Sequence, residues 1–114
     1  MRQIAIAGLF ASLAAATPLT IDRGHADDAV TDPFLGQAEA IAAGRATYGA
    51  KCYVCHHSRG ARGPNLFATT LSDEGFLRTV TNGREGTQMP SFRGRLSADE
   101  IWQVHAFVKS TDHY

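Results

Sequence analysis

Apolar positions in the first half of the chain follow a helical period. Ile41, Gly44 and Tyr48 are spaced three and four residues apart, which places them on one face of a helix over about 37–50. Asp32 and Pro33 could begin this helix as N-cap and first-turn proline, although a glycine at 36 favours the later start. A glycine on the apolar face lowers helix propensity, so we expect another helix to cross closely at Gly44.

A second amphipathic helix closes the chain. Ser97 and Glu100 form a Ser-x-x-Glu capping box, and Leu96 and Ile101 occupy the two positions of a hydrophobic staple. This helix needs a partner for its apolar face, and the long first helix is the available one. Its predicted stripe consists of Ile101, Val104, His105 and Val108, flanked by Trp102 and Phe107.

A shorter helix lies between these two, bounded by loops. Ser72 is placed as its N-cap, acids follow in the first turn, and Asn82-Gly83 ends it. Phe76, Leu77 and Val80 form its apolar side. The segments before and after this helix, 57–65 and 84–95, contain turn formers without apolar periodicity, so we expect loops there.

The N-terminus has the pattern of an export signal. Arg2 precedes an apolar run over 4–16, which is too short to span a bilayer as a stable helix. Cleavage is expected after Ala26, with cleavage after Ala16 and an uncleaved membrane anchor as alternatives. The predicted organisation is therefore a secretory signal peptide at 1–26, a flexible leader at 27–36 and one helical domain at 37–114, located in the periplasm.

Composition limits the size and the partners of the mature protein. The chain has 114 residues, 44% of them hydrophobic, with no repeat or low-complexity tract, which fits a single globular domain. After cleavage at 26 the remaining nine Lys/Arg and ten Asp/Glu nearly cancel, so nothing indicates binding to nucleic acid or to an acidic membrane. A core this small often needs a cross-link, metal or cofactor for stability.

The candidate chemistry is concentrated at 52–56, which reads Cys-Tyr-Val-Cys-His. In a helical turn Cys52, Cys55 and His56 share one face, where two sulfurs can bond porphyrin vinyl groups and the imidazole can ligate the iron. A thioredoxin-like thiol pair is the main alternative, but it requires a lowered cysteine pKa and a βαβ pattern that is absent from the sequence. A zinc site would require further ligands at suitable spacing, which the sequence lacks.

Two loop residues are candidates to complete an iron site. A carbonyl on the rigid turn at Pro64 could accept from the second nitrogen of His56, although Pro64 could equally be a plain turn residue. Met89, followed by Pro90, offers a soft thioether opposite His56; its alternative use is core packing. His57 points away from the ligand face and is read as a surface residue.

His105 lies on the apolar stripe of the last helix. It could serve as an alternative distal ligand, but a histidine packed in the core is the favoured interpretation.

Taken together, these motifs resemble the class I monohaem c-type cytochromes over about 37–110. The matching stretches, in order, are 44–48, 52–56, 63–66, Asn82-Gly83 with 89–92, and 96–108. The resemblance implies an all-α cytochrome c fold, with three to four short helices around one haem and the first and last helices crossing at Gly44, Tyr48 and Phe107. It also implies haem c attached through Cys52 and Cys55, iron ligation by His56 and Met89, and a hydrogen bond from His56 to Pro64.

The function implied by this resemblance is one-electron transfer and not catalysis. Histidine and methionine together leave no open iron position, so we expect a monomeric carrier between a redox protein donor and an acceptor such as a terminal oxidase, with membrane contact only through partner complexes. Alternatives are a cytochrome subunit of a quinoprotein alcohol dehydrogenase and a five-coordinate haem sensor or peroxidase. Five loop arginines could steer acidic partners, or could be ordinary solvated residues: Arg59, Arg62, Arg84, Arg93 and Arg95.

Overall fold

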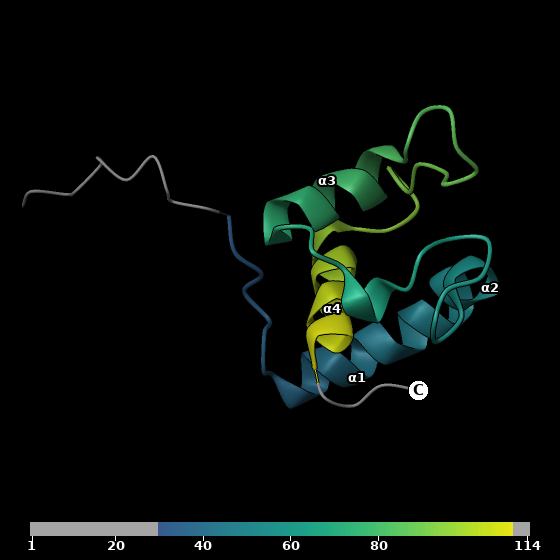
Figure 1. The fold of residues 1–114 in the computed structure, drawn as a ribbon. Coiled ribbons are helices and arrows are strands. Elements are labelled where there is room, and N and C mark those ends of the chain that lie inside the picture. The colour runs from purple at the N-terminus through teal and green to yellow at the C-terminus, as the bar shows by residue number, and fades with distance from the viewer. Residues whose placement is uncertain (1–29, 111–114) are drawn as a thin grey trace, which may run out of the picture.

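The computed structural model describes residues 30–110 as a helical fold (Figure 1). The predicted signal peptide and both of its cleavage sites lie outside the described residues. Within 30–110 there is no strand, only an isolated bridge between Arg93 and Leu96, so the all-α prediction is confirmed. The elements are α1 (Ala38–Thr47), the π-helix η1 (Tyr48–Cys52), α2 (Tyr53–His56), the 3₁₀-helix η2 (Leu66–Ala68), α3 (Asp73–Asn82) and α4 (Ala98–Lys109).

The first and last helices, α1 and α4, cross in the fold (Figure 1), and they approach each other at the glycine expected there. A Cβ atom on Gly44 would lie 1.9 Å from the backbone oxygen of Gln103 in α4, so no larger residue fits without moving a helix. Tyr48 and Phe107 pack at the same crossing with ring centroids 5.5 Å apart. The predicted crossing of α1 and α4 is therefore confirmed, and it forms the base of the core.

The predicted caps of α3 and α4 are also confirmed. The Ser72 hydroxyl accepts from Gly75 N at 3.0 Å, and α3 ends at Gly83, whose φ of 73° suits glycine. In the capping box of α4, Glu100 N donates to Ser97 Oγ at 3.1 Å while Ser97 N donates to Glu100 Oε1 at 2.9 Å. Hydrogen bonds from Ser97 lower the pKa of the Glu100 carboxyl.

The start of the first helix differs from one of the sequence alternatives. α1 begins at Ala38, with Gln37 at the N-cap and no side-chain cap, so Asp32 and Pro33 do not open it. Asp32 is instead buried, and its Oδ1 accepts from Phe34 N at 2.8 Å. The predicted leader is thus held at Asp32, because the short carboxylate finds partners in distant elements of the fold.

Those partners form a group that we call the His105 clamp, consisting of the buried Asp32 and His105 and the half-buried Asp73. His105 Nδ1 lies 2.8 Å from Asp32 Oδ2, and its Nε2 lies 3.5 Å from Asp73 Oδ1. Asp32 N also donates to Asp73 Oδ2 at 2.8 Å. The clamp therefore ties the segment before α1 to the start of α3 and to the middle of α4.

One hydrophobic cluster fills the space between the helices. Phe76 and Phe107 lie at its centre with almost no exposed surface. The partly buried side chains of Cys52 and Met89 pack against this cluster, which brings two sulfur-bearing candidate residues to the core. Its buried members are Tyr48, Phe76, Val80, Phe92, Leu96, Ile101, Val104, Phe107 and Val108.

Candidate haem-binding site

The Cys-x-x-Cys-His stretch is helical, as its spacing requires. Cys52 is the last residue of η1, and α2 continues through His56. Cys52 and Cys55 are both free thiols with intermediate exposure, whereas His56 is buried. Two thiols and one imidazole are thus presented within a little more than one helical turn.

The thiol chemistry of Cys52 counts against a thioredoxin-like centre. Burial, with a smaller contribution from the neighbouring Cys55, raises the pKa of the Cys52 thiol to about 11. A redox-active thiol pair needs a lowered pKa to supply thiolate near neutral pH. Cys52 therefore remains a neutral thiol, which is unsuited to thiol–disulfide exchange.

A tight backbone turn encloses the imidazole of His56. Its Nδ1 lies 2.7 Å from the carbonyl oxygen of Pro64. Because a carbonyl can only accept, Nδ1 carries the proton, and Nε2 of the neutral ring retains the lone pair needed to bind a metal. The ring is also confined by Gly63, where an added Cβ would lie 2.5 Å from His56 Cε1. We call the segment 56–64 the His56 turn.

The loop that contains Met89 is anchored on the end of α3. Ser91 Oγ donates to Thr81 O at 2.7 Å, and Phe92 N donates to Val80 O at 3.1 Å. Gly83 packs directly below the loop, since a Cβ there would lie 2.8 Å from Met89 O. These contacts hold Met89 with its side chain against the hydrophobic cluster.

The donor set suits a haem better than it suits other metal sites. His56 offers a free Nε2, Met89 offers a soft thioether, and Cys52 and Cys55 offer unpaired sulfurs. Across residues 30–110 no three or more His, Cys, Asp or Glu side chains gather as a metal-binding group, which counts against a zinc site. The residues present therefore fit a covalently held porphyrin.

Two other histidines lie where the sequence places them. His57 is exposed and stacks on Tyr53, with ring centroids 5.1 Å apart. His105 is fully buried in its clamp, which favours the core role over that of a distal ligand.

One contact of the site was not expected from the sequence. The buried hydroxyl of Tyr48 donates to the carbonyl oxygen of His57, directly after the candidate ligand His56. The sequence does contain one indication of this contact. Tyr48 lies on an otherwise apolar helix face, and a tyrosine hydroxyl that is buried there requires a hydrogen-bond partner.

Comparison with known proteins gives consistent results. Residues 39–108 match the family model described as cytochrome c oxidase, cbb3-type, subunit III. The chain is 36% identical over 80 residues to cytochrome c6 of Leptolyngbya boryana, covering 62% of this chain and 91% of that protein.

Solved structures show the same fold. Cytochrome cL of the methylotrophic bacterium Methylophaga aminisulfidivorans superposes with a TM-score of 0.62 at 28% identity, covering 68% of this chain. This chain spans only 58% of that cytochrome cL. Cytochrome c6 of the diatom Phaeodactylum tricornutum superposes with a TM-score of 0.50 at 30% identity, covering 60% of this chain and 88% of that one.

The family match covers more than half of the chain, and the relatives are c-type cytochromes. Membership in this family implies haem c and interaction with redox partners. None of the helices within residues 30–110 is long and apolar enough to cross a membrane. The chain belongs to the c-type cytochrome family described by this model, and it is a class I monohaem c-type cytochrome that transfers electrons and is not an enzyme.

Proposed function

We propose that this protein carries single electrons on one haem c, bonded through Cys52 and Cys55 and ligated by His56 and Met89. The main support is the 2.7 Å contact between His56 Nδ1 and Pro64 O, which prepares Nε2 as an iron ligand. Held by His56 and Met89, haem iron would supply reversible one-electron chemistry without an open position for a substrate.

The residues of this chain have distinct tasks in that function. Pro64 orients the imidazole of His56 and fixes its tautomer, while Gly63 limits rotation of the ring. The anchored loop presents Met89 from the end of α3, and Pro90 stiffens it. Packing of Cys52 and Met89 on the hydrophobic cluster excludes water, and a low dielectric disfavours the added positive charge of ferric iron.

The proposed location is the periplasm, after removal of the signal peptide at 1–26. There the domain at 37–114, preceded by the leader at 27–36, would act as a monomer between a redox protein donor and an acceptor such as a terminal oxidase. A membrane would be approached only through those partner complexes.

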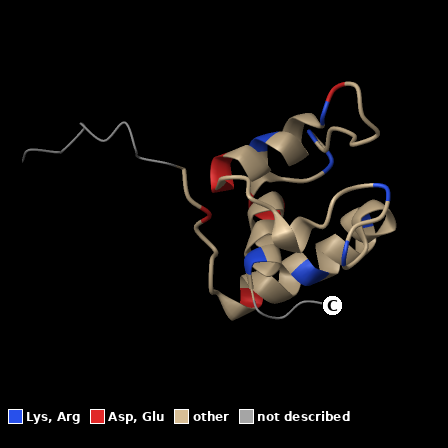
Figure 2. Ribbon diagram, in the orientation of Figure 1, with Lys and Arg blue, Asp and Glu red and all other residues tan. Residues whose placement is uncertain are grey.

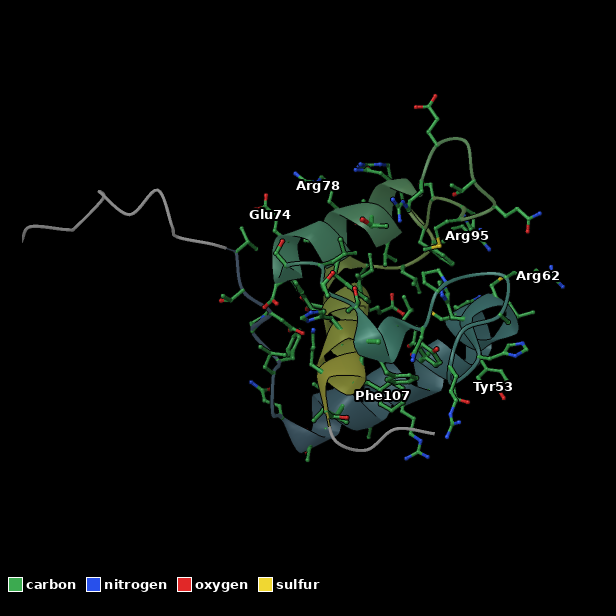
Figure 3. The ribbon with its side chains drawn as sticks, in the orientation of Figure 1. Tyr53, Arg62, Glu74, Arg78, Arg95 and Phe107 are labelled. Atoms are coloured by element: carbon green, nitrogen blue, oxygen red, sulfur yellow. The ribbon has the colours of Figure 1, made fainter. Side chains whose placement is uncertain are left out.

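The charge distribution suggests how a partner is recognised. Figure 2 shows basic residues on the loops after α2 and after α3, the second of which also contains the acidic Glu85, and it shows acidic residues at the start of α3. In Figure 3, Arg62 and Arg95 lie toward one side of the view and Glu74 lies toward the other. The five loop arginines are all exposed, so they would attract an acidic docking surface. Transfer rates that fall as ionic strength rises would support this steering, and rates independent of salt would exclude it.

A second candidate function is that of a cytochrome dedicated to one periplasmic dehydrogenase, such as a quinoprotein alcohol dehydrogenase. It is favoured by the structural likeness to cytochrome cL of a methylotrophic bacterium. Co-purification of the haem-loaded protein with such an enzyme would distinguish this role from that of a freely diffusing carrier.

The decisive experiment is a visible spectrum of protein produced with haem-attachment machinery. We expect a low-spin spectrum with a sulfur-to-iron charge-transfer band in the ferric state, and pigment that acid acetone does not extract. Cys52→Ala with Cys55→Ala should abolish covalent attachment, and Met89→Ala should abolish the charge-transfer band while haem stays bonded. A colourless wild type would contradict the proposal, and a high-spin wild type would instead support the five-coordinate sensor or peroxidase.

A further inference from the structure

The residue directly after the candidate iron ligand has an unusual backbone conformation. His57 has φ 50° and ψ −151°, and it is the one residue other than glycine with positive φ among residues 30–110. This region of conformational space is essentially restricted to glycine, and a side chain there is strained. Such a conformation persists only where neighbouring contacts hold it.

Two hydrogen bonds hold the peptide groups of His57. Its N–H donates to Tyr53 O at 2.8 Å, as part of the preceding helix. Its carbonyl oxygen accepts from the hydroxyl of Tyr48. The second contact determines where the chain goes next, because the His57 carbonyl lies in the peptide that leads out of α2.

The chain leaving His57 builds the rest of the His56 turn. Gly60 N donates to His56 O at 2.8 Å, and Gly63 N donates to Cys55 O at 2.9 Å. Gly63 and Pro64 then contact the imidazole of His56. The orientation of the strained His57 peptide is therefore transmitted to both groups that confine the ligand ring.

Tyr48 is itself fixed by the core. It is fully buried where α1 meets α4, with ring centroids 5.3 Å from Phe67 and 5.5 Å from Phe107. Phenylalanine would preserve this packing and would remove the hydrogen bond from the hydroxyl to the His57 carbonyl. Tyr48 thus links the helix crossing to the His56 turn.

We propose that Tyr48 is a positioning residue for the iron ligand His56, acting through the strained peptide of His57. This inference rests on the proposed haem function. It assigns to one hydroxyl the task of keeping Pro64 O on His56 Nδ1, and hence the imidazole in its ligating orientation.

The test compares Tyr48→Phe with wild type in haem-loaded, reduced protein. NMR hydrogen exchange should be faster by roughly five- to tenfold at Gly60 N–H, at Gly63 N–H and at the His56 Nδ1–H proton. A matched control is Ile101→Val, which removes one methylene from the core on α4. The control should not accelerate exchange selectively in the His56 turn.

Two substitutions of His57 distinguish the effect of its backbone strain from the effect of its stacked ring. In His57→Gly the strain is absent, so adding Tyr48→Phe should accelerate exchange by less than about twofold. In His57→Ala the strain remains and only the stacking on Tyr53 is lost, so the full five- to tenfold effect should persist.

The inference would be overturned if Tyr48→Phe had equal effects in the His57→Gly and His57→Ala backgrounds. It would also be overturned if Tyr48→Phe left hydrogen exchange in the His56 turn unchanged. Neither result would affect the proposed haem function. Pyridine haemochrome analysis of the wild type separates the two failures. A wild type without haem would overturn the proposed function and this inference with it.

Discussion

The two histidines that are buried within residues 30–110 sit in different electrostatic environments. His56 directs Nδ1 at a neutral carbonyl, 2.7 Å from Pro64 O. His105 directs Nδ1 at a carboxylate, 2.8 Å from Asp32 Oδ2, and its Nε2 faces a second carboxylate on Asp73 at 3.5 Å. The same residue type therefore faces a neutral backbone carbonyl in one region and lies beside two carboxylates in the other.

The comparison shows that the acceptor determines the role of a buried imidazole. A single neutral acceptor fixes the tautomer of His56 and leaves Nε2 with a lone pair. Asp32 occupies Nδ1 of His105, and Asp73 lies 3.5 Å from Nε2 without a hydrogen bond to it, so the ring is fully buried beside two carboxylates from different chain segments. The His56 turn is built from backbone groups, whereas the His105 clamp depends on side-chain charge.

Removing one carboxylate from the clamp should give the largest loss of stability. Asp32→Ala leaves His105 Nδ1 buried without an acceptor, which should lower the free energy of unfolding by about 3 kcal/mol. Urea unfolding at neutral pH measures this change. Asp32→Asn retains an acceptor oxygen for His105 Nδ1 and should cost less, so equal losses in the two variants would show that this neutral hydrogen bond contributes nothing.

Crowding the His56 turn should have the next largest effect. Gly63→Ala forces a Cβ to within 2.5 Å of His56 Cε1, which should cost about 2 kcal/mol through overpacking and displace the imidazole. Urea unfolding of haem-loaded protein gives the energy, and the low-spin fraction in the spectrum reports on the ligand.

The control for this substitution is Gly75→Ala in α3, where the nearest atom is the capping hydroxyl of Ser72 at 3.1 Å. It should cost less than Gly63→Ala, because the contact is less crowded and alanine favours the helix. A spectrum of Gly63→Ala that matches wild type would show that the turn does not confine the ring.

The capping box of α4 provides a reference outside both histidine sites. Ser97→Ala removes the acceptor for Glu100 N and should lower the free energy of unfolding by about 1 kcal/mol. Ser97→Asp retains a capping oxygen and should recover most of this loss. If Ser97→Ala lowered the free energy of unfolding as much as Asp32→Ala does, the stability of α4, and not the His105 clamp, would account for the largest loss.

The smallest expected effect is a pH dependence from Glu100. Its pKa is lowered below the ordinary value of 4.5, chiefly by the hydrogen bond from the Ser97 backbone, so the ionised carboxylate favours the folded state. This contribution to stability is fully present above pH 4.5 and is lost as the pH falls through the lowered pKa of Glu100. Stability curves between pH 3 and pH 6 should show a slightly weaker acid dependence for Glu100→Gln, and identical curves would exclude the contribution.

Local sequence patterns predicted most of the helical framework. The caps of α3 and α4, the close crossing at Gly44 and the helical form of 52–56 all follow from short-range rules of spacing and hydrogen bonding. The 3₁₀-helix η2 was not expected, because three residues offer no periodicity to read. The haem ligands remain a prediction that the geometry around His56 and Met89 supports.

By itself the sequence determined which residues could bind a haem and where α3 and α4 begin, since both depend on neighbours a few positions apart. Only the tertiary structure decided the partners of the buried polar groups. Asp32 and His105 are 73 positions apart, and Tyr48 reaches the carbonyl of His57 across a turn. Such pairings satisfy hydrogen bonds that burial would otherwise leave unmade, and burial is a property of the folded chain.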